Sequence, residues 1–346
     1  MDRDRVPSLI LGVAGSLVIL AALLHFVGVE DLLSVLSTTD ISDVLFVVIA
    51  VLGWLFAWGL ALRTVLSVLD VSLSSVKAFF VICGAMCANN VTPFGQAGGE
   101  PISAMLISKT ADTDYEKGLA AIASVDTLNF IPSILLALLG AAYFATKVTF
   151  STNLRVATGV LVFLSLAIPS GLYLGWTNRE TVETSVAHLL TTLVPQLTQR
   201  LPYISVIPGS DLRQRVRGFF RALERVATNP TDLALALTFS LCGWLCQVVA
   251  LWLAFRAIGT PIALAVVMFA VPLGAIAGIT PLPGGVGGIE SVLIAVLLAA
   301  PLPLMTKAIA FAAVVIYRGA IFWTPTIIGG VFASIVGVNA FYQEEV

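Results

Sequence analysis

The sequence contains little charge. Charged side chains make up 11% of its 346 residues and hydrophobic side chains 58%, and the mean hydropathy is +1.01. An average soluble domain has about 25% charged residues, and a single core cannot bury so much apolar side chain. A soluble globular protein is therefore excluded, and we expect an integral membrane protein.

Histidine and cysteine are scarce. The two histidines lie far apart, and the four cysteines form two pairs, Cys83/Cys87 and Cys242/Cys246. Their i,i+4 spacing inside apolar segments fits neither a zinc site nor a secreted disulfide framework. We expect the cysteines to be small packing residues, and we predict no bound metal and no cofactor.

Motifs of catalysis and of nucleic-acid binding are lacking as well. The sequence has no Gly-x-Ser-x-Gly elbow, no His-Glu-x-x-His helix and no phosphate-loop lysine signature. Its net charge of -2 provides no basic face for nucleic acid. We therefore predict a protein that is not an enzyme, with no catalytic residues and no nucleic-acid partner.

Long apolar runs, in contrast, are abundant. A helix of about 20 residues crosses a bilayer. Polar residues collect between the runs instead of alternating along ten-residue strands, which favours helices over a barrel. Six spanning helices are predicted, at about 7–27, 41–62, 117–146, 153–175, 231–255 and 306–338.

Two further apolar stretches, 75–92 and 262–280, are interrupted. Each runs into a break rich in glycine and proline, at 92–101 and 280–290, and then resumes as a short apolar run. Proline and clustered glycine stop a helix, and broken helices at membrane depth require protein or a wet cavity around them. We predict two re-entrant helical hairpins.

Lysine and arginine positions suggest the orientation. The segment 176–230 has seven basic residues against four acidic ones, which makes it a predicted cytoplasmic loop, with helical apolar spacing near its end that is typical of an interfacial helix. The scheme places both termini in the cytoplasm of a multi-pass plasma-membrane protein. Lys147 and Arg155 fall on the outside in this scheme and oppose it.

The two halves of the chain share a pattern. Trp54 and Glu100 have counterparts at an offset of 190, Trp244 and Glu290. The sequence predicts one membrane domain over 1–346 with repeats at about 40–147 and 231–338, inverted because one starts outside and the other inside. The expected fold is an all-α polytopic membrane protein with two inverted repeats, six spanning helices and two re-entrant hairpins.

Four ionisable residues lie within apolar stretches: Glu100, Asp126, Glu290 and Arg318. A charge at bilayer depth is costly and marks a functional site by default. Glu100 and Glu290 follow the breaks, so each is interpreted either as a functional carboxylate or as a helix cap. Asp126 and Arg318 occupy equivalent spans and are expected to face each other, as a structural ion pair or in substrate or proton coupling.

The glycine-rich breaks complete the candidate substrate-binding site. Glycine permits close approach of the backbone, so its amides can line a cavity for a phosphate or another anion. The alternative is a tight turn without a ligand. The candidate residues are Glu100, Asp126, Glu290, Arg318, Asn90, Thr92, Gly98, Gly99, Thr280, Gly284, Gly285 and Gly287.

Three motifs carry a resemblance to a known family. They are Asn89 to Pro93 with Gly99-Glu100, Pro283 to Gly287 with Glu290, and Tyr317-Arg318 with Phe322 to Pro325. Together they resemble the flippase-like membrane region of the lysylphosphatidylglycerol synthase family. The resemblance implies inverted repeats with re-entrant helices and movement of a lipid headgroup between leaflets, with Glu100, Glu290 and Arg318 as the charged positions.

Transport of a lipid is therefore the predicted function. The chain is expected to move a phospholipid or a lipid-linked headgroup, with an anionic phospholipid or a polyprenyl phosphate as candidate partners. Two alternatives stay open: a proton- or ion-coupled carrier of small solutes, and an intramembrane partner of a separate lipid-modifying enzyme.

Overall fold

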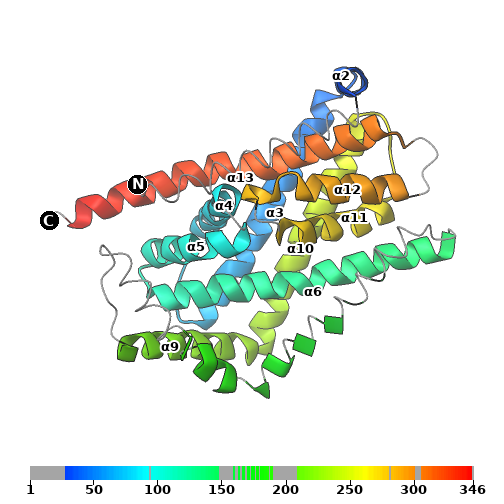
Figure 1. Cartoon of the computed structure of the whole chain (residues 1–346). Helices are drawn as coiled ribbons and strands as arrows, with labels where there is room; N and C mark the ends of the chain where they lie inside the picture. Colours follow the sequence, from blue (N-terminus) through cyan, green and yellow to red (C-terminus); the bar gives the residue numbers. More distant parts are fainter. Residues whose placement is uncertain are drawn as a thin grey trace.

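The computed structural model describes residues 28–92, 95–147, 209–279, 282–300 and 305–344, together with scattered positions from 159 to 189. This part of the chain is helical and contains no strand (Figure 1). The elements are α2 (Val29–Ser37), α3 (Ile41–Val68), α4 (Ser75–Val91), α5 (Gln96–Ala111), α6 (Tyr115–Lys147), α9 (Gly209–Ala227), α10 (Pro230–Ala257), α11 (Leu264–Ile276), the 3-10 turns η1 (Ala277–Ile279) and η2 (Pro283–Gly285), α12 (Gly288–Ala299) and α13 (Lys307–Glu344).

Four of these helices, α3, α6, α10 and α13, are long and apolar enough to cross a membrane. They confirm the spans predicted at 41–62, 117–146, 231–255 and 306–338. The span predicted at 7–27 lies outside the described residues, and of the span at 153–175 only isolated positions are described. The fold is thus an all-α polytopic membrane protein.

Polar side chains cap two of the long helices at their first residues. Asp40 accepts a hydrogen bond from the backbone N–H of Ser42 at the start of α3, and Asn229 accepts one from Asp232 at the start of α10. The hydroxyl and the backbone N–H of Ser42 also hold the pKa of the Asp40 carboxyl below its ordinary value. The caps explain why these two apolar runs begin where they do.

Helices α3 and α10 form the antiparallel centre of the bundle. The backbone N–H of Asp40 donates to the carbonyl of Ala257 over 2.9 Å, and Arg256 pairs with Asp43 at 3.3 Å, so the start of α3 meets the end of α10. A Cβ at Gly243 would lie 2.2 Å from the Trp58 ring, so the helices touch where glycine leaves room.

The two interrupted segments fold back as hairpins. Helix α4 packs on α5, and α11 packs on α12. In each pair a glycine of the first limb faces a leucine of the second: a Cβ at Gly84 would lie 2.8 Å from Leu106, and one at Gly274 would lie 2.7 Å from Leu293. The predicted interruption of both helices is confirmed.

The hairpins enter the bundle from opposite ends (Figure 1). The α4–α5 hairpin follows the end of α3 and leads into α6, whereas the α11–α12 hairpin follows the end of α10 and leads into α13. Since α3 and α10 are antiparallel, these entry points lie at opposite ends. The long helix that follows each hairpin packs on the first limb of the other one: α13 on α4, and α6 on α11.

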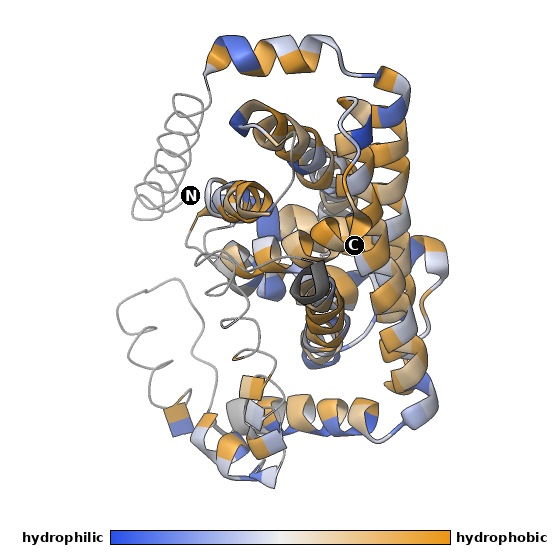
Figure 2. Ribbon diagram, turned by 90° about the vertical axis from the view of Figure 1, so that its right-hand side faces the viewer, coloured by the Kyte–Doolittle hydropathy of each residue, from blue (hydrophilic) through white to orange (hydrophobic). Residues whose placement is uncertain are grey.

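Helix α9 crosses the end of the bundle at which α3 ends. Its residues Val216, Ala222 and Val226 are buried, while Arg217, Arg221 and Arg225 are exposed. Hydrophobic residues dominate the long helices, whereas hydrophilic residues are frequent in α2, above them, and in α9, below them (Figure 2). Helix α9 is therefore amphipathic, and it lies near the end of the segment 176–230.

Candidate functional site

A buried ion pair lies beside the second break. Arg318, in the middle of α13, donates through Nε to Oε1 of Glu290 over 2.7 Å, and less than a tenth of each side chain is exposed. Arg318 also donates through Nη2 to the carbonyl of Gly284 over 2.9 Å. The second Glu290 oxygen accepts the backbone N–H of Gly287 at 2.6 Å. Glu290 therefore caps α12 and at the same time binds Arg318.

The glycines of the second break are required by its backbone. Gly284, Gly285 and Gly287 have φ values of 60°, 64° and 90°, a region that side chains disfavour. A Cβ at Gly284 would lie 2.5 Å from the Phe322 ring. The backbone thus approaches α13 closely enough for the carbonyl of Gly284 to reach Arg318.

Two carboxylates lie beside the first break. Asp126, on α6, is 7% exposed, and it lies near Gln96 and Glu100 of α5. Glu100 is partly buried in α5. Among the described residues neither carboxylate forms an ion pair. Because α5 begins at Gln96, Glu100 is its fifth residue and does not occupy the capping position that Glu290 takes in α12.

The two breaks meet in space. A Cβ at Gly95, in the first break, would lie 3.2 Å from the carbonyl oxygen of Gly278, in η1. Asn90, in the last turn of α4, donates to the carbonyl of Phe322 over 3.1 Å and to Oγ1 of Thr326 over 2.9 Å. The tips of both hairpins and the middle of α13 therefore form one centre.

The remaining sequence-predicted residues have local contacts. Thr92 donates its hydroxyl to the carbonyl of Ala88 over 2.7 Å, at the end of α4. Gly98 and Gly99 lie in the first turns of α5, and Gly99 packs directly against Asn89 of α4. Thr280 lies outside the described residues.

The ion pair expected between Asp126 and Arg318 does not form among the described residues. Arg318 binds Glu290 at 2.7 Å, whereas Asp126 lies near Gln96 and Glu100. The reason is the packing of each hairpin against the helix that follows it: α12 places Glu290 on α13, and α5 places Gln96 and Glu100 on α6. Asp126 of α6 thus lies beside the α4–α5 hairpin, and Arg318 of α13 lies beside the α11–α12 hairpin.

Several buried polar residues near the centre were not predicted. Ser240 donates to Oδ1 of Asn129 over 2.5 Å, and Trp244 donates through its indole to the Asn129 carbonyl over 2.9 Å. Tyr317 donates to Oε1 of Gln247 over 3.4 Å. These bonds join α10 to α6 and to α13. Amide side chains inside apolar spans were the available signal, because a buried amide requires partners.

The comparisons with known proteins agree with this architecture. The chain is 26% identical over 346 residues to a UPF0104 membrane protein of Methanothermobacter thermautotrophicus, covering 97% of this chain and 95% of that relative. It is 24% identical over 315 residues to a UPF0104 membrane protein of Pyrococcus horikoshii, covering 89% and 91%. The family described as "Lysylphosphatidylglycerol synthase TM region" matches residues 9–329. Since that match spans nearly the whole sequence, the chain belongs to this family of membrane proteins.

Proposed function

We propose that the protein is a lipid translocase, which moves a phospholipid or a lipid-linked headgroup between the leaflets of the plasma membrane. The observation that carries the proposal is the charged centre at which the two hairpin tips meet. The buried Glu290–Arg318 pair lies beside the second tip, and Glu100 and Asp126 lie beside the first, within an apolar bundle. Ionisable groups at membrane depth mark substrate pathways and proton relays.

The helix arrangement supports two inverted repeats, at about 40–147 and 231–338, within one membrane domain. Helices α3 and α10 are antiparallel, and the hairpins that follow them enter from opposite ends. Inverted repeats of secondary transporters bind substrate near the middle of the membrane, and access alternates as one repeat moves against the other. In this proposal the hairpin tips are the moving contact.

The phosphate of the headgroup binds Arg318 in this proposal. A guanidinium has five N–H donors, of which Arg318 uses one for Glu290 and one for Gly284. Arginine binds phosphate oxygens in a bidentate manner, so an entering phosphate competes with Glu290 for Arg318. The backbone N–H of Gly287 also donates to Glu290, so a phosphate that displaces Glu290 gains this amide as a further donor.

Glu100 and Asp126 bind the positive part of the cargo or carry the coupling protons. Both lie at the centre without a cationic partner among the described residues. A bound ammonium group or a proton would neutralise them. In this proposal Glu100 and Asp126, beside the first break, bind a cation or a proton. Arg318, beside the second break, binds a phosphate.

Leaflet exchange in proteoliposomes tests the proposal. Fluorescent phosphatidylglycerol, its aminoacylated form and a polyprenyl phosphate are compared, each with wild type, Glu290→Gln and Arg318→Ala. We expect wild type to exchange at least one of these lipids and both variants to lose most of that exchange. Full exchange by both variants, or no exchange by folded wild type, would contradict the proposal.

A carrier of small solutes coupled to protons or ions is a second candidate. The Glu100 and Asp126 carboxylates, which form no ion pair with any described residue, favour it, because such groups bind coupling ions in secondary transporters. Thermal stabilisation by a solute, together with no effect of any lipid, would select this candidate.

A third candidate is a membrane partner of a separate lipid-modifying enzyme. It is favoured by the family description, which names the transmembrane region of a synthase. Co-purification of a synthase or a transferase with the full chain would select it, and the chain itself would then show no exchange.

A further inference from the structure

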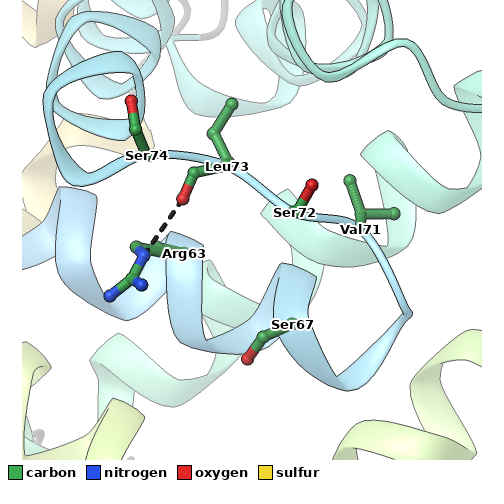
Figure 3. A pocket seen from close by; sticks show the side chains of 6 residues that line it. All are labelled: Arg63, Ser67, Val71, Ser72, Leu73 and Ser74. Carbon is green, nitrogen blue, oxygen red and sulfur yellow. Dashed lines mark hydrogen bonds between the residues drawn. The ribbon is translucent and has the colours of Figure 1, made fainter.

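A cavity of about 340 Å³ lies where α3 ends and α4 begins, at the opposite end of α4 from the first hairpin tip. Figure 3 shows the residues that line it. It is lined by Arg63 and Ser67 of α3 and by the connecting residues Val71, Ser72, Leu73 and Ser74. Four of the six lining residues thus carry a guanidinium or a hydroxyl, and these four are exposed. The lining therefore has the donors that an anion requires.

Arg63 is fixed by one bond and keeps donors free. Its Nε donates to the carbonyl of Leu73 over 3.0 Å, which orients the guanidinium at the cavity. Within the described part of the chain its two terminal nitrogens have neither a hydrogen bond nor an ion pair, and the same holds for the hydroxyl of Ser72. Asp70, seven residues after Arg63, is paired with Arg225 at 2.8 Å. A pre-oriented guanidinium with unused donors is suited to phosphate.

Arg63 lies near the edge of the hydrocarbon core, within reach of the lipid headgroups. Helix α3 has 28 residues, which is about 42 Å at 1.5 Å per residue, whereas the hydrocarbon core is about 30 Å thick. Arg63 lies five residues before the end of α3, about 8 Å along the axis. With the excess length shared equally between its two ends, the Arg63 backbone lies about 2 Å inside the edge of the hydrocarbon core, and its long side chain reaches the phosphates by snorkelling.

An apolar stripe leads from the cavity toward the middle of the membrane. Ile49, Phe56 and Arg63 follow one another at seven-residue spacing and so share one face of α3, and the first two are 51% and 45% exposed. Phe79 of α4 flanks the stripe, with its ring centroid 6.4 Å from that of Phe56. A phosphate at Arg63 would thus have its acyl chain beside exposed apolar side chains.

We propose that this cavity binds the phosphate of a phospholipid in the leaflet at the α9 end of the protein, with one acyl chain along the stripe of Ile49 and Phe56. The exposed arginines of α9 lie at the same end and attract anionic lipids to it. The site is separate from the tip centre. It binds lipid whether or not the protein translocates lipid.

Lipid titration of the purified full chain, followed by native mass spectrometry, tests this site. The probes are phosphatidylglycerol, a diacylglycerol that lacks the phosphate, and inorganic phosphate. We expect Arg63→Gln to weaken the tightest phosphatidylglycerol binding by about tenfold, the range of a lost charge-assisted bond. Lys77→Gln, which removes an exposed charge one turn into α4 and outside the cavity, is the matched control and should change binding less than twofold.

Equal phosphatidylglycerol binding by wild type and Arg63→Gln would overturn the proposal, and so would equally tight binding of diacylglycerol. Displacement of phosphatidylglycerol by millimolar inorganic phosphate would assign the cavity to free phosphate instead of lipid. Should Arg63→Gln fail to fold, Ser72→Ala and Arg63→Lys replace it. Each must then weaken binding by several-fold, because one removes a hydroxyl donor and the other the forked guanidinium.

Discussion

Arg318 is the residue that fixes the second hairpin tip to α13. Its guanidinium binds a side-chain oxygen of Glu290 and the backbone oxygen of Gly284, both in the segment that ends and restarts the helix. Taking two charges out of water is costly, and removal of one partner leaves the other buried without compensation, at about 3–5 kcal/mol. The stability of this tip therefore depends on both charges being present or both being absent.

A double-mutant cycle measures that dependence. Arg318→Ala should lower the free energy of unfolding by about 3 kcal/mol, because the Glu290 carboxylate keeps only the Gly287 N–H. Glu290→Gln added to Arg318→Ala should restore part of the loss, since no buried charge then remains. Thermal unfolding in one detergent is the measurement. Losses that simply add in the double variant would show that the two side chains do not interact.

At the scale of elements, the hairpins are held by close backbone contacts at glycine. A Cβ at Gly329 of α13 would lie 2.0 Å from the carbonyl oxygen of Cys83 in α4, and one at Gly140 of α6 would lie 2.8 Å from the backbone of Phe269 in α11. In both contacts a long helix packs on the first limb of the other hairpin. Small residues allow such close packing where lipid provides no hydrophobic drive between helices.

Two glycines of one helix give a matched test of this packing. Gly329→Ala should destabilise the protein by about 1–3 kcal/mol, because the methyl group overlaps the backbone of α4. Gly319→Ala, ten residues earlier in α13 with open space at its Cβ, should be neutral or stabilise by about 0.5–1 kcal/mol through helix propensity. Unfolding temperatures compare the two, and equal losses would contradict the packing account.

Helices and breaks were the part of the fold that the sequence could predict. A spanning helix depends on the length of its own apolar run, and a break depends on its own cluster of glycine and proline. Both signals are local in the sequence, so it predicted α3, α6, α10, α13 and both breaks. The pairing of Arg318 was not, since it depends on how α12 folds back onto α13 and brings residues 28 positions apart together. The Arg63 cavity was not predicted either, because two of its six lining residues belong to α3 and four to an ordinary connection.

At the scale of the whole molecule, the two ends of the bundle differ in charge. The α9 end carries Arg63, Lys77 and the exposed arginines of α9 beside Asp70, whereas the α2 end carries Glu30, Asp31, Asp40 and Asp43 beside Arg256. Lysine and arginine concentrate on the cytoplasmic side of membrane proteins. The α9 end is therefore expected to be cytoplasmic, in agreement with the orientation predicted from the sequence.

Labelling of introduced cysteines tests this orientation. Ser37→Cys, at the exposed end of α2, should react with a membrane-impermeant maleimide in intact cells, and Thr228→Cys, just after α9, should react only after permeabilisation. Both variants are made in a chain whose four native cysteines are replaced by serine or alanine. The reverse labelling pattern would show that the protein has the opposite orientation in the membrane.

Transport through the centre requires the two halves to separate at the hairpin tips. In this structure the Glu290–Arg318 pair is buried, and Asn90 joins α4 to Phe322 and Thr326 of α13. Since α4 belongs to the first proposed repeat and α13 to the second, these bonds cross the boundary that must open. The structure is thus a closed conformation in the proposed cycle.

A reversible link across this boundary is the most direct test of the account. Asn90→Cys with Thr326→Cys, in the chain without native cysteines, is joined by a short thiol-specific linker that contains a reducible disulfide. We predict that lipid exchange in proteoliposomes stops when the link forms and resumes when it is reduced, while the single variants treated in the same way exchange lipid throughout. Undiminished exchange by the fully linked protein would contradict transport through the hairpin tips.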